Sequence, residues 1–264
     1  MKITMLGTGH AVVTSCYNTC YVMEDGERRL LVDGGGGISL LRQLKAAGIR
    51  WNTIHEIFVT HRHLDHITGI LWMMRMLGGP LASGKMKEDV FVYGHDEVIG
   101  ILDQMIRSLL PERAELIGKR IHLVEVRDRE QGELMGKPVT FFDIHSVKAK
   151  QFGFVMDDNG RKIVVCGDEP LHEECMEPAE GAEMILHEAF CLYSEREKYH
   201  PYEKQHSTVK DACETAQRLH ARRLLLYHSE ESDLKNRKQR YTEEGRQYYD
   251  GMLYVPDDLD VIEF

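Results

Sequence analysis

The apolar residues in the first half of the chain predict short strands separated by acidic or glycine-containing turns. We expect these strands at residues 2–6, 20–23, 29–32, 56–60, 90–93, 121–126 and 139–144. Apolar residues at helical spacing predict helices at 38–47, 67–77 and 96–110. In this interpretation the strand at 56–60 leads into a polar loop that ends where the second helix begins.

The second half of the chain continues the same alternation. Asp157-Asp158-Asn159-Gly160 predicts a tight hairpin turn, because Asn-Gly suits the positive φ angles of such turns. Further elements are expected as strands at 152–156, 162–166, 183–187 and 223–227, helices at 207–221 and 233–249, and two short terminal strands. No repeat or linker interrupts the pattern, so we expect a single domain, residues 1–264. The order of elements favours two mixed sheets packed together with helices outside, an α+β four-layer αβ/βα sandwich.

Composition narrows the class of protein. The chain has 264 residues, of which 42% are hydrophobic and 29% charged, as in ordinary globular proteins. No membrane span or signal-peptide layout is visible, and the six cysteines form no CxxC pair, so we expect a reduced, cytoplasmic setting. The net charge of −10 disfavours a broad nucleic-acid surface, and the 14 histidines point to metal or acid–base chemistry.

The segment His61-Arg62-His63-Leu64-Asp65-His66 concentrates three imidazoles and a carboxylate. In an extended loop, His61 and His63 project to the same side and can bind one ion together, while Asp65 and His66 can serve a second ion. Borderline divalent metals favour this combination of nitrogen and oxygen ligands. The alternative is a histidine-rich surface loop without metal. The apolar strand before the segment and the helix after it favour a rigid site.

This segment resembles the signature of the metallo-β-lactamase superfamily, and four further motifs of that family follow the expected order. They are Asp33 after strand 29–32, His145 after strand 139–144, Asp168 in Gly167-Asp168, and His228 after strand 223–227. The resemblance implies two divalent metal ions and an activated water that bridges them and attacks the substrate. It places His61, His63 and His145 on one ion and Asp65, His66 and His228 on the other, with Asp168 bridging. Asp33 would shape the site without binding metal. Zinc is the default metal, and manganese and iron remain open.

Two motifs resemble the ribonuclease Z branch of that superfamily. His187-Glu188-Ala189-Phe190 is similar to its His-Glu-Ala-Thr motif, and His206-Ser207-Thr208 matches its His-Ser-Thr motif. The resemblance implies that Glu188 orients His206 and that His206 protonates the leaving oxygen, so we count Asp65, Glu188 and His206 as catalytic residues. The alternatives are that His206 only neighbours a helix cap and that His187 is a buried structural histidine.

The chain also departs from ribonuclease Z. Residues 10–18 lack the proline and arginine of the loop that senses the tRNA end, and only a hairpin separates His145 from Asp168, where many members insert a tRNA-binding arm. One basic cluster remains, formed by Arg222, Arg223, Lys235, Arg237, Lys238 and Arg240. It could bind a phosphate or another anionic group, or it could be a solvated helix face paired with Glu243 and Glu244.

The sequence therefore predicts a binuclear phosphodiesterase that acts on a small or nucleotide-like substrate, with neither folded RNA nor a membrane as partner. The alternatives are a tRNA 3′ endonuclease of the ribonuclease Z type, a hydrolase of lactones, thioesters or β-lactams, and a non-catalytic metal-binding sensor. The pair of motifs around Glu188 and His206 counts against lactone or thioester chemistry, which does not need a leaving-group acid. The complete ligand set counts against a sensor. A homodimer, common among relatives, remains open.

Overall fold

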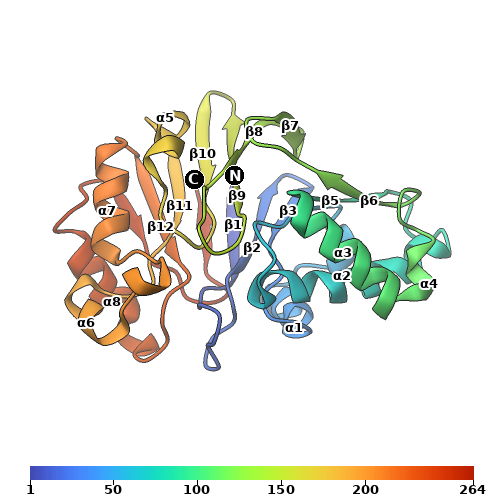
Figure 1. The fold of residues 1–264 in the computed structure, drawn as a ribbon, viewed down its shortest axis with the longest axis horizontal. Helices are drawn as coiled ribbons and strands as arrows, with labels where there is room; N and C mark the ends of the chain where they lie inside the picture. Colours follow the sequence, from blue (N-terminus) through green and yellow to red (C-terminus); the bar gives the residue numbers. More distant parts are fainter. The chain divides into compact units, whose positions relative to one another are not determined.

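The structure is a computed structural model that describes residues 1–264, and the chain divides into two compact units (Figure 1). The first unit consists of Met1–Gly7, Tyr17–Val126 and Asp258–Phe264, and the second of Thr8–Cys16 and Arg127–Asp257. Each unit contains one seven-stranded sheet with both parallel and antiparallel neighbours, together with helices. This architecture confirms the predicted α+β class.

The sheet of the first unit has the strand order β14-β1-β2-β3-β4-β5-β6. Its strands are β1 (Lys2–Gly7), β2 (Cys20–Asp25), β3 (Arg28–Val32), β4 (Glu56–Phe58), β5 (Val90–Gly94), β6 (Ile121–Glu125) and β14 (Val261–Glu263). β3 and β4 run parallel, with Leu31 opposite Ile57. Since parallel strands end at the same edge of a sheet, the residues that follow β3 and β4 lie next to each other. Asp33 and the His61 segment occupy these positions.

The helix after β4 begins three residues earlier than the apolar pattern predicts. It is α2 (Leu64–Ala82), and its first backbone hydrogen bonds run from the N–H groups of His66 and Ile67 to the carbonyl of His63. The apolar pattern starts only at Ile67, because the buried positions before it are occupied by polar ligand-type side chains. Asp65 and His66 therefore lie in the first helical turn and not in a loop, and an acidic residue there is favourable for the helix dipole.

The remaining helices of the first unit are α1 (Ser39–Ala46), η1 (Trp51–Thr53), α3 (Asp96–Leu109) and α4 (Pro111–Ala114). Side chains from sheet and helices form one buried core, which includes Leu31, Ile57, Met73, Val92 and Leu102. Because these strands and helices bury apolar side chains in one core, their sequences consist of short apolar segments. α2 has 19 residues and a buried apolar face, but neither it nor any other helix is long and apolar enough to cross a membrane.

The sheet of the second unit has the strand order β13-β12-β11-β10-β9-β8-β7. Its strands are β7 (Gln131–Leu134), β8 (Lys137–Asp143), β9 (Phe152–Asp158), β10 (Arg161–Val165), β11 (Met184–Glu188), β12 (Arg223–Tyr227) and β13 (Met252–Tyr254). The predicted hairpin joins β9 and β10, with Asn159 at φ 56° and Gly160 at φ 85°. β7 has no counterpart in the predictions, because Gln131-Gly132-Glu133-Leu134 lacks an apolar alternation and three of its four residues are exposed.

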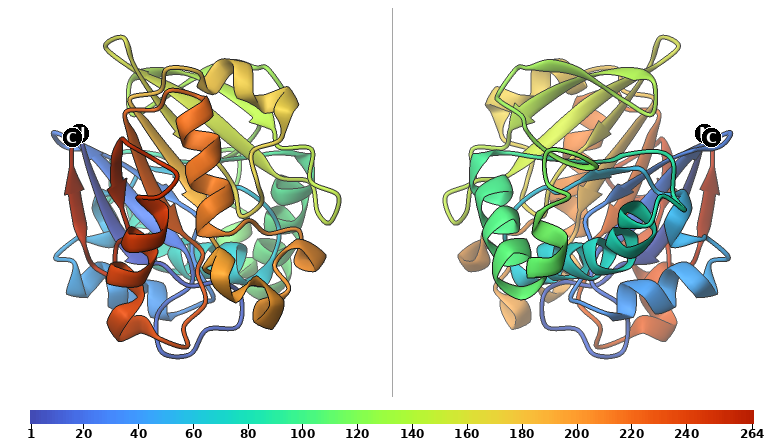
Figure 2. Two further views of the ribbon diagram at one scale, coloured as in Figure 1. Left: turned by 90° about the vertical axis from the view of Figure 1, so that its left-hand side faces the viewer. Right: turned by 90° about the vertical axis from the view of Figure 1, so that its right-hand side faces the viewer.

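The helices of the second unit are η2 (Glu173–Cys175), α5 (Met176–Ala179), η3 (Tyr193–Glu195), α6 (Arg196–Tyr199), η4 (Tyr202–Lys204), α7 (Val209–Arg218) and α8 (Leu234–Gly245). α7 begins with a capping box, in which Thr208 and Asp211 each accept a hydrogen bond from the other's backbone N–H. α7 and α8 lie along one face of the sheet (Figure 2), and Ala212 and Tyr241 join Ile185 in the buried core there. Both helices are shorter than predicted, α7 at both ends and α8 mainly at its end.

Candidate metal centre

The His61 segment forms a strand-to-helix corner in the first unit, and its imidazoles face each other. Nε2 of His61 lies 2.9 Å from Nδ1 of His63, and the ring centroids of His61 and His66 are 4.1 Å apart. His61, Asp65 and His66 are buried, with at most 6% of their surface exposed. Buried imidazoles and carboxylates within this distance of one another form a ligand set suited to divalent metal ions. The segment is therefore not a solvated surface loop.

The carboxylate of Asp33 orients the ring of His66 directly and the ring of His61 through Thr60. Its Oδ2 accepts hydrogen bonds from Nδ1 of His66 at 2.7 Å and from Oγ1 of Thr60 at 2.8 Å, and its Oδ1 accepts from the backbone N–H of Thr60 at 2.8 Å. Since Thr60 gives its only hydroxyl hydrogen to Asp33, it accepts at 3.0 Å from Nδ1 of His61. Both rings thus carry hydrogen on Nδ1, and in the neutral form each offers the lone pair of Nε2 to a metal.

The backbone after β3 approaches α2 closely enough to bring Asp33 to His66. The N–H of Gly34 donates to the carbonyl of His66 at 2.7 Å, and the N–H of Gly69 donates to Gly35 at 3.0 Å. A side chain on Gly69 would collide with the carbonyl of Gly34, so this contact requires glycine. Gly69 is therefore needed for the close approach that brings Asp33 to His66.

Charge also favours cation binding around His66. Burial lowers the pKa of His66, but the carboxylates of Asp65 and Asp33 outweigh it and raise that pKa well above its usual range. Oδ2 of Asp65 lies 3.3 Å from Nε2 of His66, on the side of the ring away from Asp33. A metal ion at Nε2 would take the place of a proton between two buried carboxylates.

A second donor group lies in the second unit, at the carboxyl ends of β10 and β12. Asp168, His206 and His228 each place one ligand atom so that the three atoms lie within 4.8 Å of one another. Oδ2 of Asp168 is 3.4 Å from Nε2 of His228, and neither residue is more than 5% exposed. β10, β11 and β12 run parallel, which brings their ends to one edge of the sheet. This group also fits a divalent metal ion in ligand chemistry and burial.

The contacts of His206 differ from the sequence-based expectation. Its Nδ1 lies 2.8 Å from the backbone carbonyl of Asp168, to which it donates, and 3.8 Å from Oε2 of Glu188. Glu188 instead accepts hydrogen bonds from the backbone N–H and the hydroxyl of Ser207. Glu188 is fully buried, and this burial raises its pKa well above its usual range. It therefore anchors the backbone next to His206 and does not bond to the ring directly.

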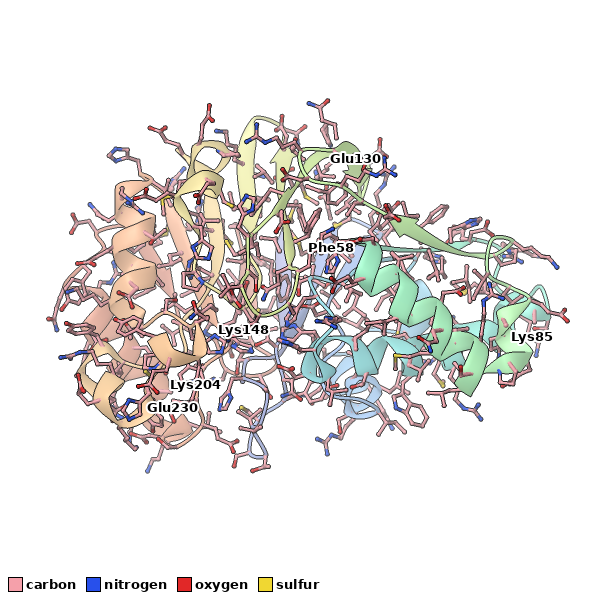
Figure 3. All side chains as sticks on the ribbon, viewed as in Figure 1. Phe58, Lys85, Glu130, Lys148, Lys204 and Glu230 are labelled. Atoms are coloured by element: carbon pink, nitrogen blue, oxygen red, sulfur yellow. The ribbon has the colours of Figure 1, made fainter.

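His206 is neutral at neutral pH. Burial and the neighbouring His228 lower its pKa to about 3, and Lys148 (labelled in Figure 3) acts in the same direction. With Nδ1–H donated to the carbonyl of Asp168, the unprotonated atom of the ring is Nε2. His206 is thus placed to accept a proton, a metal ion or a hydrogen bond through Nε2.

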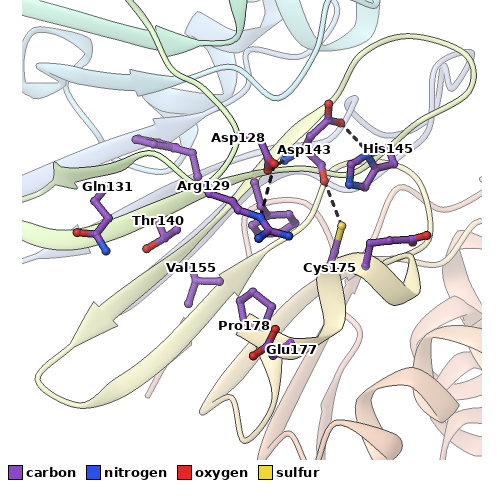
Figure 4. Close-up of a pocket in the computed structure, with 13 residues that line it drawn as sticks. Asp128, Arg129, Gln131, Thr140, Asp143, His145, Val155, Cys175, Glu177 and Pro178 are labelled. Atoms are coloured by element: carbon purple, nitrogen blue, oxygen red, sulfur yellow. Dashed lines mark hydrogen bonds and ion pairs between the residues drawn. The ribbon is translucent and has the colours of Figure 1, made fainter.

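His145 lies outside the donor group of its own unit. It follows β8 with φ 62°, it is exposed, and its backbone N–H donates to Oδ1 of Asp143 at 2.8 Å. Its side chain lines a cavity of about 410 Å³ beside Asp143 and Cys175 (Figure 4). Of the predicted ligands in the second unit, the structure thus brings together Asp168 and His228 but not His145.

The basic cluster is largely neutralised by neighbouring acids. Arg237 is 3% exposed and donates to the hydroxyls of Ser229 and Thr8 at 3.1 and 2.9 Å. The other ion pairs join Lys238 to Asp257, Arg240 to Glu195 and Asp233, and both Arg222 and Arg223 to Glu183. These contacts disfavour a phosphate site, but they do not match the predicted solvated face either, because none of these partners is Glu243 or Glu244 and Arg237 is buried. Arg237 thus holds the side chain of Ser229, the residue after His228, a contact that its position in the sequence did not reveal.

His187 and the cysteines have structural roles. Nδ1 of the buried His187 donates to the carbonyl of Glu188 at 2.7 Å, and its Nε2 accepts from the N–H of Leu171 at 3.1 Å. These two bonds use both ring nitrogens, which confirms the structural interpretation. All six cysteines are free thiols, and five of them are buried.

Comparison with known proteins identifies a matching family and similar relatives. The sequence profile of the family described as "Anti-Pycsar protein Apyc1" matches residues 1–247. A ribonuclease Z of Halorubrum lacusprofundi is 27% identical, over 100% of this chain and 97% of the relative. Among solved structures, the metallo-β-lactamase fold protein YhfI of Bacillus subtilis has a TM-score of 0.79 and 18% identity, covering 100% of this chain and 99% of that chain. The short form of human tRNase Z has a TM-score of 0.73 and 23% identity, with the same coverage.

Fold and donor residues together define the class: a metal-dependent hydrolase with the metallo-β-lactamase fold, similar to ribonuclease Z. Within this class the chain belongs to the family of the anti-Pycsar protein Apyc1, whose profile covers most of both units. The predicted fold type and the predicted ribonuclease Z-like character are both confirmed.

Proposed function

We propose that this protein hydrolyses phosphodiester bonds in small or nucleotide-like substrates, using two divalent metal ions. One observation carries the proposal: the imidazoles of His61 and His66 are held through Nδ1 by a single carboxylate network, with Nε2 directed away from it. This arrangement is the one that orients histidines as metal ligands. The ribonuclease Z relatives support phosphodiesters as the substrate class.

The proposed metal ligands are the motif residues of the single domain, residues 1–264, that the sequence predicts. By the resemblance to the metallo-β-lactamase superfamily, His61, His63 and His145 would hold one ion, Asp65, His66 and His228 would hold the other, and Asp168 would serve both. Zinc is the expected metal, with manganese and iron as alternatives. The bound ions would activate a water molecule and stabilise the negative charge that develops on the phosphate oxygens.

His206 is the proposed donor of the proton that the leaving oxygen needs. Hydrolysis requires that a proton reach the leaving oxygen, and His206 is neutral because its pKa is about 3. We propose that Nε2 carries the proton that reaches the leaving oxygen, while Nδ1 keeps its bond to the carbonyl of Asp168. Glu188 supports this role indirectly, by fixing Ser207 next to the ring.

Three features favour a small substrate over a folded RNA. Residues 10–18 lack proline and arginine, and the chain between His145 and Asp168 forms only the hairpin of β9 and β10. The net charge is −10, and the basic cluster that could have bound phosphates is paired with acids. A tRNA 3′ endonuclease is the second candidate, because relatives across the full length of the chain are ribonuclease Z proteins.

A panel of substrates tests the reaction class. Zinc-loaded protein should hydrolyse bis(p-nitrophenyl) phosphate, with much slower turnover of p-nitrophenyl phosphate, a lactone and a thioester. Chelation should abolish the hydrolysis of the diester, and added zinc should restore it. Faster turnover of the lactone or the thioester than of the diester would contradict the proposal.

A further inference from the structure

Gln151 is a fully buried side chain that contacts Asp168 at two points. Its Nε2 donates to Oδ1 of Asp168 at 2.5 Å, and its Oε1 accepts from the backbone N–H of Asp168 at 2.8 Å. A backbone N–H can only donate, so the second contact identifies Oε1 and the first must come from the amide NH₂. One amide thus clamps both the side chain and the backbone of the same residue.

This clamp divides the two carboxylate oxygens of Asp168 between different partners. Oδ1 is taken by Gln151, whereas Oδ2 lies 3.4 Å from Nε2 of His228, in the donor group of the second unit. A carboxylate without such a partner could rotate and present either oxygen. With Gln151 on Oδ1, the rotation is fixed and a single oxygen faces the cation position.

Backbone contacts on both sides fix the position of the Gln151 side chain relative to Asp168. The carbonyl of Gln151 accepts from the N–H of Ile144 at 2.9 Å, which closes the neck of the loop that carries His145. A side chain on Gly167 would collide with Oε1 of Gln151, so the clamp also explains the glycine before Asp168. In the same loop, Ser146 donates to Oε1 of Glu169 at 2.8 Å.

We infer that Gln151 is a positioning residue for the metal centre: it occupies Oδ1 of Asp168 so that Oδ2 alone is presented to the metal, and it ties the His145 loop to that aspartate. The inference rests on the proposed function, because it takes Asp168 and His145 as ligands. Gln151 touches neither substrate nor metal in this account. Its effect therefore has to appear in metal binding and not only in turnover.

Two substitutions separate the parts of the clamp. Gln151→Met keeps the length of the side chain and removes both hydrogen bonds, whereas Gln151→Glu keeps an acceptor for the backbone N–H and replaces the donor to Oδ1 by a carboxylate. Gln43→Met is the matched control, because Gln43 is also buried and donates to the carbonyl of Leu6 at 2.6 Å in the first unit. It removes the same chemical group without touching Asp168.

The test is a zinc titration of the metal-free full-length chain, against a competing chromophoric chelator, with the thermal unfolding of each variant recorded alongside. Loss of a residue that orients a metal ligand typically weakens metal binding by about 10–100-fold. We expect a loss in this range for both Gln151 variants, a larger one for Gln151→Glu because two carboxylates then face each other, and wild-type affinity for Gln43→Met.

Each outcome decides the inference. Wild-type zinc affinity in a folded Gln151→Met variant would overturn it, and so would an equal loss in Gln43→Met. If neither Gln151 variant folds, Gln151 is a residue of the core and the inference also fails. If the wild-type chain itself binds no zinc, the proposed function fails instead, so the two failures are distinguishable.

Discussion

The ring of Phe190 lies parallel to the ring of His206, with an interplanar angle of 8° and 5.1 Å between centroids. Phe190 stands where the ribonuclease Z motif has threonine, and it is 3% exposed. The stack covers one face of the imidazole, while the carbonyl of Asp168 holds Nδ1. These two contacts restrict both the tilt and the rotation of the His206 ring. A fixed ring orientation suits the proton transfer that we propose for His206.

This restriction leads to a prediction about leaving groups. His206→Ala should slow the hydrolysis of an alkyl phosphodiester by about 10²–10⁴-fold, the usual contribution of general acid catalysis, and should hardly affect a p-nitrophenyl ester, whose leaving group needs little protonation. The measurement is the rate ratio of the two esters. His200→Ala, at an exposed histidine of the same unit, is the control. An equal loss on both esters would mean that His206 is structural.

Asp33 is predicted to act on metal binding without being a ligand. Asp33→Asn leaves an amide with a single acceptor oxygen in place of a carboxylate that accepts three hydrogen bonds, from His66 and Thr60. The ring of His66 loses its orientation, so zinc affinity should fall by about 10–100-fold in a chelator competition. Asp25→Asn, at the exposed end of β2, should have no effect. Unchanged zinc affinity in folded Asp33→Asn would refute this role.

Sequence patterns predicted the elements that bury an apolar face and missed those that do not. The strands around the two parallel edges and the Asn159-Gly160 turn were predicted correctly, because burial and turn geometry constrain residue type locally. β7 is exposed and polar, and the start of α2 is buried by ligand-type residues, so neither gives an apolar signal.

The same limit applies to the site. Motif spacing identified the residues that we propose as metal ligands and catalytic groups. It did not identify Thr60, Gln151 or Phe190, whose contacts join distant segments of the chain. Arg237 illustrates the difficulty: it reads as part of an exposed basic cluster, yet its side chain is buried against Ser229 and Thr8. Only the three-dimensional structure separates a cation that stabilises the fold from one that could bind a substrate.

A buried ion pair predicts how stability depends on pH. Burial alone would raise the pKa of Asp158, but Lys137 at 2.6 Å and Arg161 outweigh it and lower that pKa. The stabilisation is therefore complete above the unfolded value of about 3.9 and is lost as the pH falls through the lower, folded value. Asp158→Asn should reduce the free energy of unfolding by about 3 kcal/mol at pH 7, because Lys137 is left buried without its partner charge.

Urea unfolding of the wild type and of Asp158→Asn at pH 7 and pH 3 measures this dependence. The difference between the two proteins should shrink at pH 3, because this pH lies below the unfolded value of about 3.9 and Asp158 is then largely protonated in the unfolded chain. A difference that stays constant across this range would show that the ion pair is not the cause of the stability change.

Substrate size is tested by the dependence of binding on salt. A substrate held through one or two phosphates loses little affinity as the salt concentration rises, whereas each additional phosphate contact steepens the slope of log affinity against log salt by about 0.7–0.9. We expect a shallow slope for a dinucleotide and little specific cleavage of precursor tRNA. Efficient cleavage of precursor tRNA at its 3′ end, with a steep slope, would favour the endonuclease and reject the small substrate.

We propose that hydrolysis requires two metal ions, with Asp168 as a ligand to both. A titration of activity with zinc tests this proposal most directly. Metal-free protein is mixed with increasing equivalents of zinc, and both bound zinc and the hydrolysis of bis(p-nitrophenyl) phosphate are measured. We predict activity that rises with bound zinc and saturates at about two ions per chain, as two complete ligand sets with a bridge require, and no activity for Asp168→Ala at any zinc concentration. Full activity in metal-free protein, or wild-type activity in Asp168→Ala, would contradict the account.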